Sequence, residues 1–240
     1  MRSPALVLVA TAVLVLAACG SEQRSDRATS TARAAPAATP FPSIDRADLV
    51  AGRTYTTRLF RPSITLTLPE GEWLATGADS ADHIEIEPAA VKDPVDHATL
   101  AFHHMTRVFD PARGGKVAGD AVPGPADFAA WLTHHPHLRT TKPRPVEALG
   151  LKGVSIDVRV KSSQPRRYKD CGKVGGECVV MFISSIEPIV YGSRSFGRFY
   201  VLQQPDGKQL VVEQAVEPAS AFKAQKPAFD AVLKSATTAG

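Results

Sequence analysis

The sequence of 240 residues contains no asparagine and only three cysteines. The absence of asparagine excludes Asn-X-Ser/Thr glycosylation and every active site that needs a catalytic asparagine. It also leaves glycine, aspartate and proline to build the turns. A strong net charge is missing as well: the formal charge of +4 is too small to indicate a protein that binds nucleic acid.

The N-terminus has the pattern of an export signal. A positive charge at Arg2 precedes the apolar run Ala5–Leu16, which a single threonine interrupts. This run of about 12 residues suits a signal peptide and is too short for a bilayer, which takes about 20 residues. The following Leu16-Ala-Ala-Cys19 resembles the lipobox of bacterial lipoproteins. We therefore expect residues 1–18 to be a lipoprotein signal peptide and Cys19 to be the lipid attachment site.

The cysteine count supports lipid attachment. Cys171 and Cys178 lie close together in the sequence and would pair in an oxidising compartment, which leaves Cys19 as the odd thiol. Acylation accounts for this thiol, whereas an ordinary secretory signal would leave it without a role. The diacylglycerol of a lipoprotein supplies two acyl chains, such as palmitate, and two chains anchor a protein stably. The mature protein is expected at the extracytoplasmic face of a cell membrane, anchored without crossing it.

Composition divides the mature chain into a tether and one domain. Residues 19–47 are rich in serine, threonine, alanine and proline and have no large hydrophobic residue before Phe41, so a disordered, lipidated tether is expected. Such a coil reaches on the order of 30 Å. Residues 48–240 contain neither a comparable linker nor an internal repeat, and they are numerous enough for a single hydrophobic core.

Alternating apolar and β-branched residues predict a domain built mainly of strands. The predicted strands are Arg53–Phe60, Ser63–Leu68, His83–Glu87, Thr99–Phe102, Val154–Val160, Val179–Ile183, Phe199–Leu202 and Gln209–Glu213. The turn signal Pro205-Asp206-Gly207 joins the last two as a hairpin. Two helices are expected, Pro125–His135 and Ser220–Ser235, the second kinked or restarted at Pro227. The fold class is α+β: a single domain with a mostly antiparallel β-sheet flanked by helices.

Some of these segments resemble a known family. The segments are Phe128-Ala-Ala-Trp-Leu-Thr-His-His-Pro-His-Leu138, Gly150-Leu-Lys-Gly-Val-Ser-Ile-Asp-Val158 and Leu68-Pro-Glu-Gly-Glu-Trp73. They are similar to a pattern of exported actinobacterial proteins, the Lpq-type lipoproteins with a PsbP-like fold, over most of residues 50–236. Ala148-Leu149-Gly150 departs from the paired glycines of that pattern. The resemblance implies a fold and a compartment but no catalytic residues, because the function of these proteins is mostly unassigned.

Cys171 and Cys178 close a loop of eight residues just before the apolar run Val179–Ile183. We expect a structural disulfide there, worth roughly 2.5 kcal/mol by loop-closure entropy. The alternatives fit less well, because zinc needs two more ligands nearby in the sequence and redox catalysis favours Cys-X-X-Cys.

Histidines form two clusters, His103-His104 and His134-His135-Pro-His137. A metal site would need His103, His135 and His137 to converge. Against this, imidazoles at a helix C-terminus interact favourably with its dipole and cap its last carbonyl groups. We expect neither a metal nor a cofactor, and these three histidines are the only candidate ligands.

Two further patterns have a catalytic interpretation. Glu85 and Glu87 share one face of a predicted strand, about 7 Å apart, which suits the carboxylates of a glycosidase but occurs in any Glu-X-Glu strand. The segment Gly192–Gly197 resembles Gly-X-Ser-X-Gly with its glycines one residue too far apart, so a polar turn is expected instead. Neither pattern leads us to expect an enzyme.

Basic residues concentrate in one segment. Arg139–Lys173 holds ten basic and three acidic residues, a net +7, while the rest of the mature chain is net −4. The segment either consists of solvated strands and loops or forms a surface for an anionic partner. The candidate partner-binding residues are Arg159, Lys161, Arg166, Arg167 and Lys169.

The sequence thus predicts a membrane-anchored extracytoplasmic lipoprotein that acts as a non-catalytic binding module for a protein, a wall polymer or a lipid. The alternative is a cell-envelope hydrolase or a metal-binding protein that uses the histidine cluster. The expected partners are the membrane, through the lipid anchor, and an envelope protein or anionic polymer. Nucleic acid is not among them.

Overall fold

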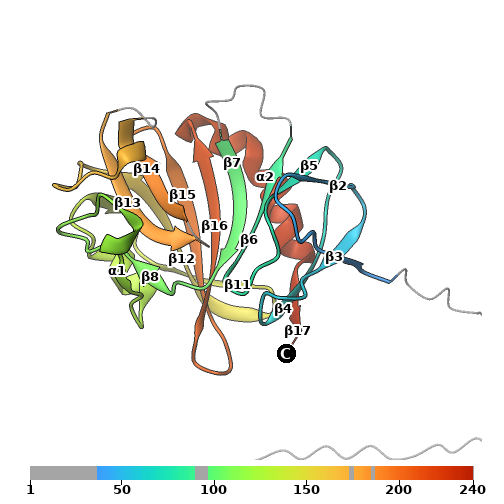
Figure 1. The fold of residues 1–240 in the computed structure, drawn as a ribbon. Coiled ribbons are helices and arrows are strands. Elements are labelled where there is room, and N and C mark those ends of the chain that lie inside the picture. The colour runs from blue at the N-terminus through green and yellow to red at the C-terminus, as the bar shows by residue number, and fades with distance from the viewer. Residues whose placement is uncertain (1–36, 90–96, 173–175, 185–186, 240) are drawn as a thin grey trace, which may run out of the picture. The chain divides into compact units, whose positions relative to one another are not determined.

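The computed structural model describes residues 37–89, 97–172, 176–184 and 187–239. The predicted signal peptide and Cys19 lie outside the described residues. The chain from Ala37 to Gly240 is one compact unit. Its strands form three sheets and its helices are few, so the fold is α+β and mostly antiparallel, as predicted (Figure 1). No helix among the described residues combines the length and apolarity that a membrane span requires.

The largest sheet has nine strands, all paired antiparallel. Its order is β10 (Leu138–Thr140), β12 (Leu151–Val160), β15 (Phe196–Gln203), β16 (Gln209–Glu217), β7 (His97–His103), β6 (His83–Pro88), β5 (Trp73–Gly77) and β2 (Ala47–Leu49), with β11 (Arg144–Ala148) also paired to β12. The predicted hairpin is present between β15 and β16. Gly207 in its turn has a φ of 83°, a conformation that glycine adopts without a Cβ penalty.

Two smaller sheets and the helices cover this large sheet. One small sheet contains β1 (Thr39–Pro40), β3 (Thr54–Thr56), β4 (Ser63–Thr67) and β17 (Thr237–Ala239), and the other contains β14 (Glu187–Gly192), β13 (Cys178–Ser184), β8 (Arg107–Val108) and β9 (Val122–Pro123). The α-helices are α1 (Phe128–Thr133) and α2 (Phe222–Ser235), and short 3₁₀-helices span Ala118–Asp120, Lys169–Gly172 and Ala219–Ala221.

The large sheet buries apolar side chains on both of its faces. Consecutive residues of a strand point to opposite faces, and the neighbours Val201 and Leu202 of β15 accordingly belong to different hydrophobic clusters. Leu202 packs in the cluster of α2 and the β1–β3–β4–β17 sheet, which includes Phe229. Val201 packs in the cluster of α1 and the β13–β14 strands, which includes Phe182. Two separate layers therefore cover the sheet, one on each face.

Both predicted helices are present, and each begins later than predicted. Asp127 is the N-cap of α1, and its side chain accepts a hydrogen bond from the amide of Ala130 at 2.9 Å, so the helix does not start at Pro125. The second helix, α2, begins at Phe222 after a 3₁₀ turn. It continues through Pro227 without a restart, because its buried apolar face holds it against the sheet.

The folded domain begins earlier than the predicted boundary at residue 48. Residues 37–47, which the prediction assigns to the tether, belong to the domain, because β1 pairs with β3 and Phe41 is buried. The rings of Phe41 and Tyr55 meet edge to face, with centroids 6.5 Å apart. Strand pairing and the buried ring of Phe41 thus order a segment whose average composition resembles a linker.

Candidate functional site

The five candidate partner-binding residues lie in two different places. Arg159 and Lys161 are at the end of β12, beside β10. Arg166 lies near the 3₁₀-helix Ala118–Asp120, where its guanidinium pairs with Asp120 at 2.9 Å. Lys169 lies over the ring of its neighbour Tyr168, 5.9 Å from the centroid, and Arg167 is exposed.

Three exposed arginines share one face of the large sheet at its β10 edge. Arg139 stands directly opposite Arg159, and Arg144 stands directly opposite Ser155. Ser155 and Arg159 are four residues apart on β12, so their side chains point to the same face. We call Arg139, Arg144 and Arg159 the basic edge.

Within the part of the chain that the structure describes, no carboxylate forms an ion pair with the basic edge. Asp157, which lies on β12 between Ser155 and Arg159, is bound to Arg198 of β15 by hydrogen bonds of 2.6 and 3.0 Å. The hydrogen bond to Asp157 raises the pKa of Arg198. The Arg159 guanidinium lies 5.1 Å from the centroid of the Phe196 ring. Like charges directly opposite on neighbouring strands repel each other, and an anionic ligand would relieve that repulsion.

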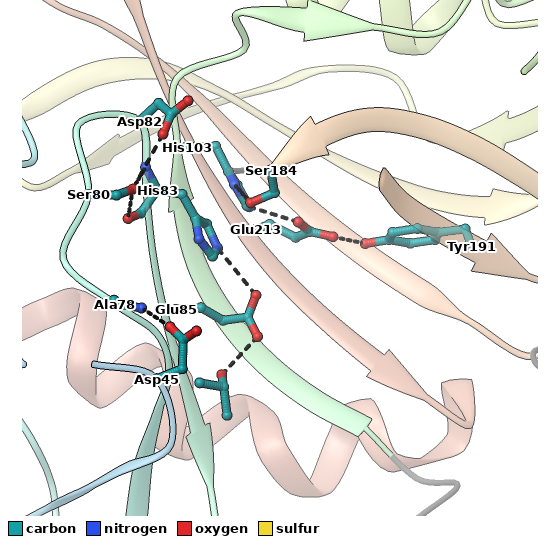
Figure 2. Close-up of polar contacts among 11 residues, drawn as sticks. Asp45, Ala78, Ser80, Asp82, His83, Glu85, His103, Ser184, Tyr191 and Glu213 are labelled. Atoms are coloured by element: carbon teal, nitrogen blue, oxygen red, sulfur yellow. Dashed lines mark hydrogen bonds and ion pairs between the residues drawn. The ribbon is translucent and has the colours of Figure 1, made fainter. Parts of the chain in front are cut away.

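A second polar group of residues is buried between the large sheet and the β13–β14 strands, as Figure 2 shows. His103 Nε2 on β7 lies 2.9 Å from Glu213 Oε2 on β16. Tyr191 on β14 donates its hydroxyl proton to the other oxygen of Glu213. Ser184 Oγ on β13 lies 3.3 Å from His103 Nδ1. We call this group the buried network; its side chains connect two sheets.

The buried network extends across β6 toward the surface. His83 stands directly opposite His103, and the two rings stack with centroids 5.0 Å apart (Figure 2). His83 Nε2 lies 3.3 Å from Glu85 Oε2, and Thr76 donates to the other Glu85 oxygen at 2.8 Å. The Glu85 side chain is 19% exposed, so this end of the network reaches solvent.

Burial and hydrogen bonding together set the pKa values of these groups. Burial raises the pKa of Glu213 to about 7, and the hydrogen bond from Tyr191 opposes this rise. Burial also lowers the pKa of His103, and the neighbouring His83 lowers it further. Burial alone would raise the pKa of Glu85, but the hydrogen bond from His83 and other interactions outweigh it, so that pKa is lowered. At neutral pH, His103 is therefore uncharged and Glu213 is near its titration point.

Two hollows open on the described part of the molecule. The smaller, of about 600 Å³, lies between α1 and strands β12 and β15, where Thr133, Lys152 and Val201 line it. The larger, of about 1550 Å³, lies beside the β15–β16 turn, where Lys208 and His104 are among its lining residues.

Ser184, His103 and Glu213 are connected like a hydrolytic triad, but they are not accessible to a substrate. All three side chains are buried. None of them lines either of the two hollows, and a nucleophile must reach its substrate. The arrangement serves as an internal hydrogen-bond network.

The three candidate metal ligands do not form one site. His103 belongs to the buried network, whereas the His135 ring lies beside that of His137, with centroids 6.1 Å apart. Burial lowers the pKa of His135 to about 4, and His137 adds to this effect. Among the described residues, no three His, Cys, Asp or Glu side chains are placed to hold a metal ion together. The predicted helix cap is present: His134 Nδ1 lies 2.8 Å from the carbonyl oxygen of Ala130.

The two patterns with a catalytic interpretation lie on strand β6 and at the turn between β14 and β15. Glu85 and Glu87 lie on the same face of β6, and burial, together with the charge of Glu85, raises the pKa of Glu87 to about 7. Neither side chain lines a hollow described above. In the segment Gly192–Gly197, residues 193–195 form the predicted turn, and the flanking residues belong to β14 and β15.

Cys171 and Cys178 are joined, with their Cα atoms 5.7 Å apart, a separation typical of disulfides. This agrees with the predicted pairing.

Three members of the buried network, Ser184, Tyr191 and Glu213, are not predicted from the sequence. The available signal is the charge of Glu213 within Leu210–Val216, a segment that is otherwise mostly apolar. A lone carboxylate in a buried strand requires a partner.

No protein-family model matches the sequence, and no curated protein matches it. The PsbP protein of the cyanobacterium Synechocystis sp. PCC 6803 is similar in structure at 8% identity, covering 80% of this chain and 95% of its own, with a TM-score of 0.38. LpqN of Mycobacterium tuberculosis, a protein involved in cell envelope biogenesis, is similar at 11% identity, covering 82% and 91%, with a TM-score of 0.30. The names PsbP and Lpq are also those of the fold and the lipoprotein group whose pattern the sequence resembles. At such identities and TM-scores, neither similarity carries information about function.

Proposed function

We propose that this chain is a non-catalytic binding module, held at the extracytoplasmic face of a membrane through a lipidated Cys19, that binds an anionic polymer through the basic edge. The observation that carries the proposal is the register of β10 and β12, which sets Arg139 directly opposite Arg159. Such a pair costs stability in the free protein. Binding of an anion offsets this cost, which gives the like-charge pair a role.

The chemistry of the basic edge supports an anionic ligand. Arginine binds carboxylate and phosphate groups with two parallel hydrogen bonds, and three arginines on one face provide several such contacts. The strand β10 has only three residues and lies at the end of the sheet, so the arginine side chains meet solvent. Arg166, in contrast, already has a carboxylate partner in Asp120 and contributes less.

The test uses the purified mature chain, residues 19–240, with Cys19→Ser, which removes the predicted acylation site. Binding to polyphosphate and to poly-L-glutamate is measured by fluorescence anisotropy at several salt concentrations, with neutral dextran as the reference polymer. Arg139→Glu should weaken binding about tenfold or more, because charge-assisted hydrogen bonds are worth about 1.5–3 kcal/mol each. Arg53→Glu, which makes the same charge change at an exposed arginine outside the basic edge, is the matched control.

Stability separates loss of binding from loss of folding. Arg139→Glu replaces a like-charge pair by an opposite-charge pair with Arg159, so the variant should unfold at a slightly higher temperature than the parent chain. Equal binding of the Arg139→Glu and Arg53→Glu variants, or binding that does not weaken as salt rises, would exclude the basic edge as the polymer site.

A further inference from the structure

Two neighbouring loops expose large apolar side chains to solvent. Ile44, in the loop between β1 and β2, is 67% exposed, and Leu59, in the loop between β3 and β4, is 59% exposed. Most side chains of this size and polarity are buried in this domain. We call the loops of residues 42–46 and 57–62 the apolar loops.

A buried aspartate fixes both apolar loops. The Asp79 carboxylate accepts hydrogen bonds from the backbone amides of Leu59 and Phe60, both at 3.0 Å, and also from that of Arg58. The amide of Asp79 donates to the carbonyl oxygen of Pro42 at 2.9 Å. These contacts end the strand predicted over Arg53–Phe60 at Thr56 and hold the two loops next to each other. Ile44 and Leu59 are therefore presented on backbone that is already ordered.

The charge of the apolar loops is mainly positive. They contain three exposed arginines, Arg46, Arg58 and Arg61, and one acid, Asp45. Asp45 Oδ1 accepts a hydrogen bond from the amide of Ala78 at 2.8 Å, which occupies one of its oxygens. Exposed aliphatic side chains with arginine neighbours match the interface of an anionic bilayer, where the apolar group enters and the guanidinium binds a headgroup.

The path of the chain brings these loops toward the anchor. The predicted lipid site Cys19 precedes the domain by 18 residues, from Cys19 to Pro36. A coil of that length spans roughly 25 Å. The domain begins with β1, which leads directly into the loop that contains Ile44. An anchored chain thus enters the domain beside the apolar loops.

We propose that the apolar loops form a second membrane contact, in which Ile44 and Leu59 enter the headgroup region of the bilayer and Arg46, Arg58 and Arg61 bind its anionic lipids. This inference rests on the proposed membrane location. The contact is made near β2 and β3, whereas the basic edge lies on β10, β11 and β12, at the other end of the strand order of the large sheet from β2. The domain would therefore sit on the membrane with its polymer-binding surface turned away from the loops.

The test is sedimentation of the mature chain, residues 19–240 with Cys19→Ser, because the apolar signal peptide would itself bind lipid. The vesicles contain phosphatidylglycerol and phosphatidylcholine, or phosphatidylcholine alone. The chain should bind the anionic vesicles and bind phosphatidylcholine much less. The double variant Ile44→Ser, Leu59→Ser should bind the anionic vesicles at least about tenfold more weakly, because both apolar groups leave the bilayer. Val117→Ser is the matched control, since Val117 is also 59% exposed but lies outside the apolar loops; it should bind like the parent chain.

Three outcomes would overturn the membrane contact. The first is equal vesicle binding by the double variant and the Val117→Ser control. The second is vesicle binding that depends on Arg139 and not on Ile44 and Leu59, which would place the basic edge on the membrane. The third is a parent chain that sediments as a dimer and a double variant that is monomeric, which would make the loops an interface between two copies.

The polymer assay distinguishes this inference from the proposed function. The double variant should retain full polyphosphate binding while it loses vesicle binding. If the chain binds vesicles through the apolar loops but does not bind polyphosphate, the membrane contact is supported and the proposed polymer-binding function is excluded.

Discussion

The two faces of the nine-stranded sheet are made by the same strands and yet differ in chemistry. On β7, Phe102 points into the apolar cluster beneath α2, and the next residue, His103, points into the buried network. On β16, Val212 likewise points into the apolar cluster, and the next residue, Glu213, points into the buried network. Phe229 of α2 completes the first face, whereas Tyr191 of β14 completes the second.

Because of this difference, we expect the stability of only one side of the sheet to depend on pH. Apolar burial contributes a free energy that does not depend on protonation. The contribution of the buried network depends on the charge states of Glu213 and His103. We therefore expect the packing of β13 and β14 on the large sheet to respond to pH, and the packing of α2 to be indifferent to it.

The largest expected effect is on the apolar face. Phe229→Ala removes a fully buried ring beneath α2 and should lower the free energy of unfolding by about 3–5 kcal/mol. Urea unfolding at pH 5, 6, 7 and 8 should give the same loss at each pH. A loss of unfolding free energy that changes strongly with pH would contradict the expectation that the apolar face is insensitive to pH.

On the network face, Tyr191→Phe removes the hydroxyl that donates to Glu213. The buried Oε1 of Glu213 then lacks a donor, which should cost about 1–3 kcal/mol, while Oε2 keeps its contact with His103. Because the hydrogen bond from Tyr191 lowers the pKa of Glu213, its loss should raise that pKa, and the cost should grow as the pH rises. Tyr168→Phe, outside the network, serves as the control in the same urea titrations; a cost independent of pH would contradict the role assigned to Tyr191.

The pH dependence itself is tested by Glu213→Gln. Because the pKa of Glu213 is raised from 4.5 to about 7, its contribution to stability is complete below pH 4.5 and is lost as the pH rises through 7. Because the pKa of His103 is lowered below 6.5, its contribution is present above pH 6.5 and is lost as the pH falls. The two slopes oppose each other in the parent chain.

Relative to the parent chain, the Glu213→Gln variant should lack the Glu213 slope, so its stability should fall more steeply as the pH decreases from 7 toward 5, by up to ~1.4 kcal/mol per pH unit. It should also gain stability relative to the parent chain above pH 7. Equilibrium unfolding between pH 5 and pH 8 measures both effects, with Glu147→Gln as the exposed control. Parallel profiles for parent and variant would show that Glu213 does not titrate in this range.

The smallest expected effect concerns an exception on the apolar face. Gln214 is fully buried there, and neither its amide nitrogen nor its oxygen has a hydrogen-bond partner among the described residues. Gln214→Met should increase the free energy of unfolding by about 1 kcal/mol, because it removes an unpaired polar group at similar volume. Thermal unfolding measures this gain, and a lower midpoint would indicate that the amide is hydrogen bonded to solvent.

Local sequence patterns predict much of the fold. Alternation is sufficient for β12, where Asp157 and Arg159 face one way and Ile156 and Val158 the other, and the apolar run of β13 correctly indicates a fully buried strand. Strands β1, β2, β8 and β9 have two or three residues each and show no periodicity to detect. They form because neighbouring strands complete their hydrogen bonds, which is a tertiary effect.

The sites are less predictable than the fold, because they depend on register. The sequence singles out Arg159 and His103 as candidate site residues but not the residues they meet. Strand pairing sets Arg139 opposite Arg159 and His83 opposite His103. A shift of one residue would separate both pairs by turning them to opposite faces. The convergence of Glu213 with Tyr191 likewise requires the packing of one sheet on another.

The junction of β4 and β17 has a consequence for the order in which the chain folds. Thr67 at the end of β4 and Ser235 at the end of α2, 168 residues apart, exchange hydrogen bonds of 2.9 Å next to the pairing of β4 with β17. A chain that emerges N-terminus first presents β4 long before β17 arrives, and such distant pairing forms late and slowly. Until β17 arrives, β4 therefore presents an unpaired edge, and β17 removes this template for pairing with other chains only at the end of folding.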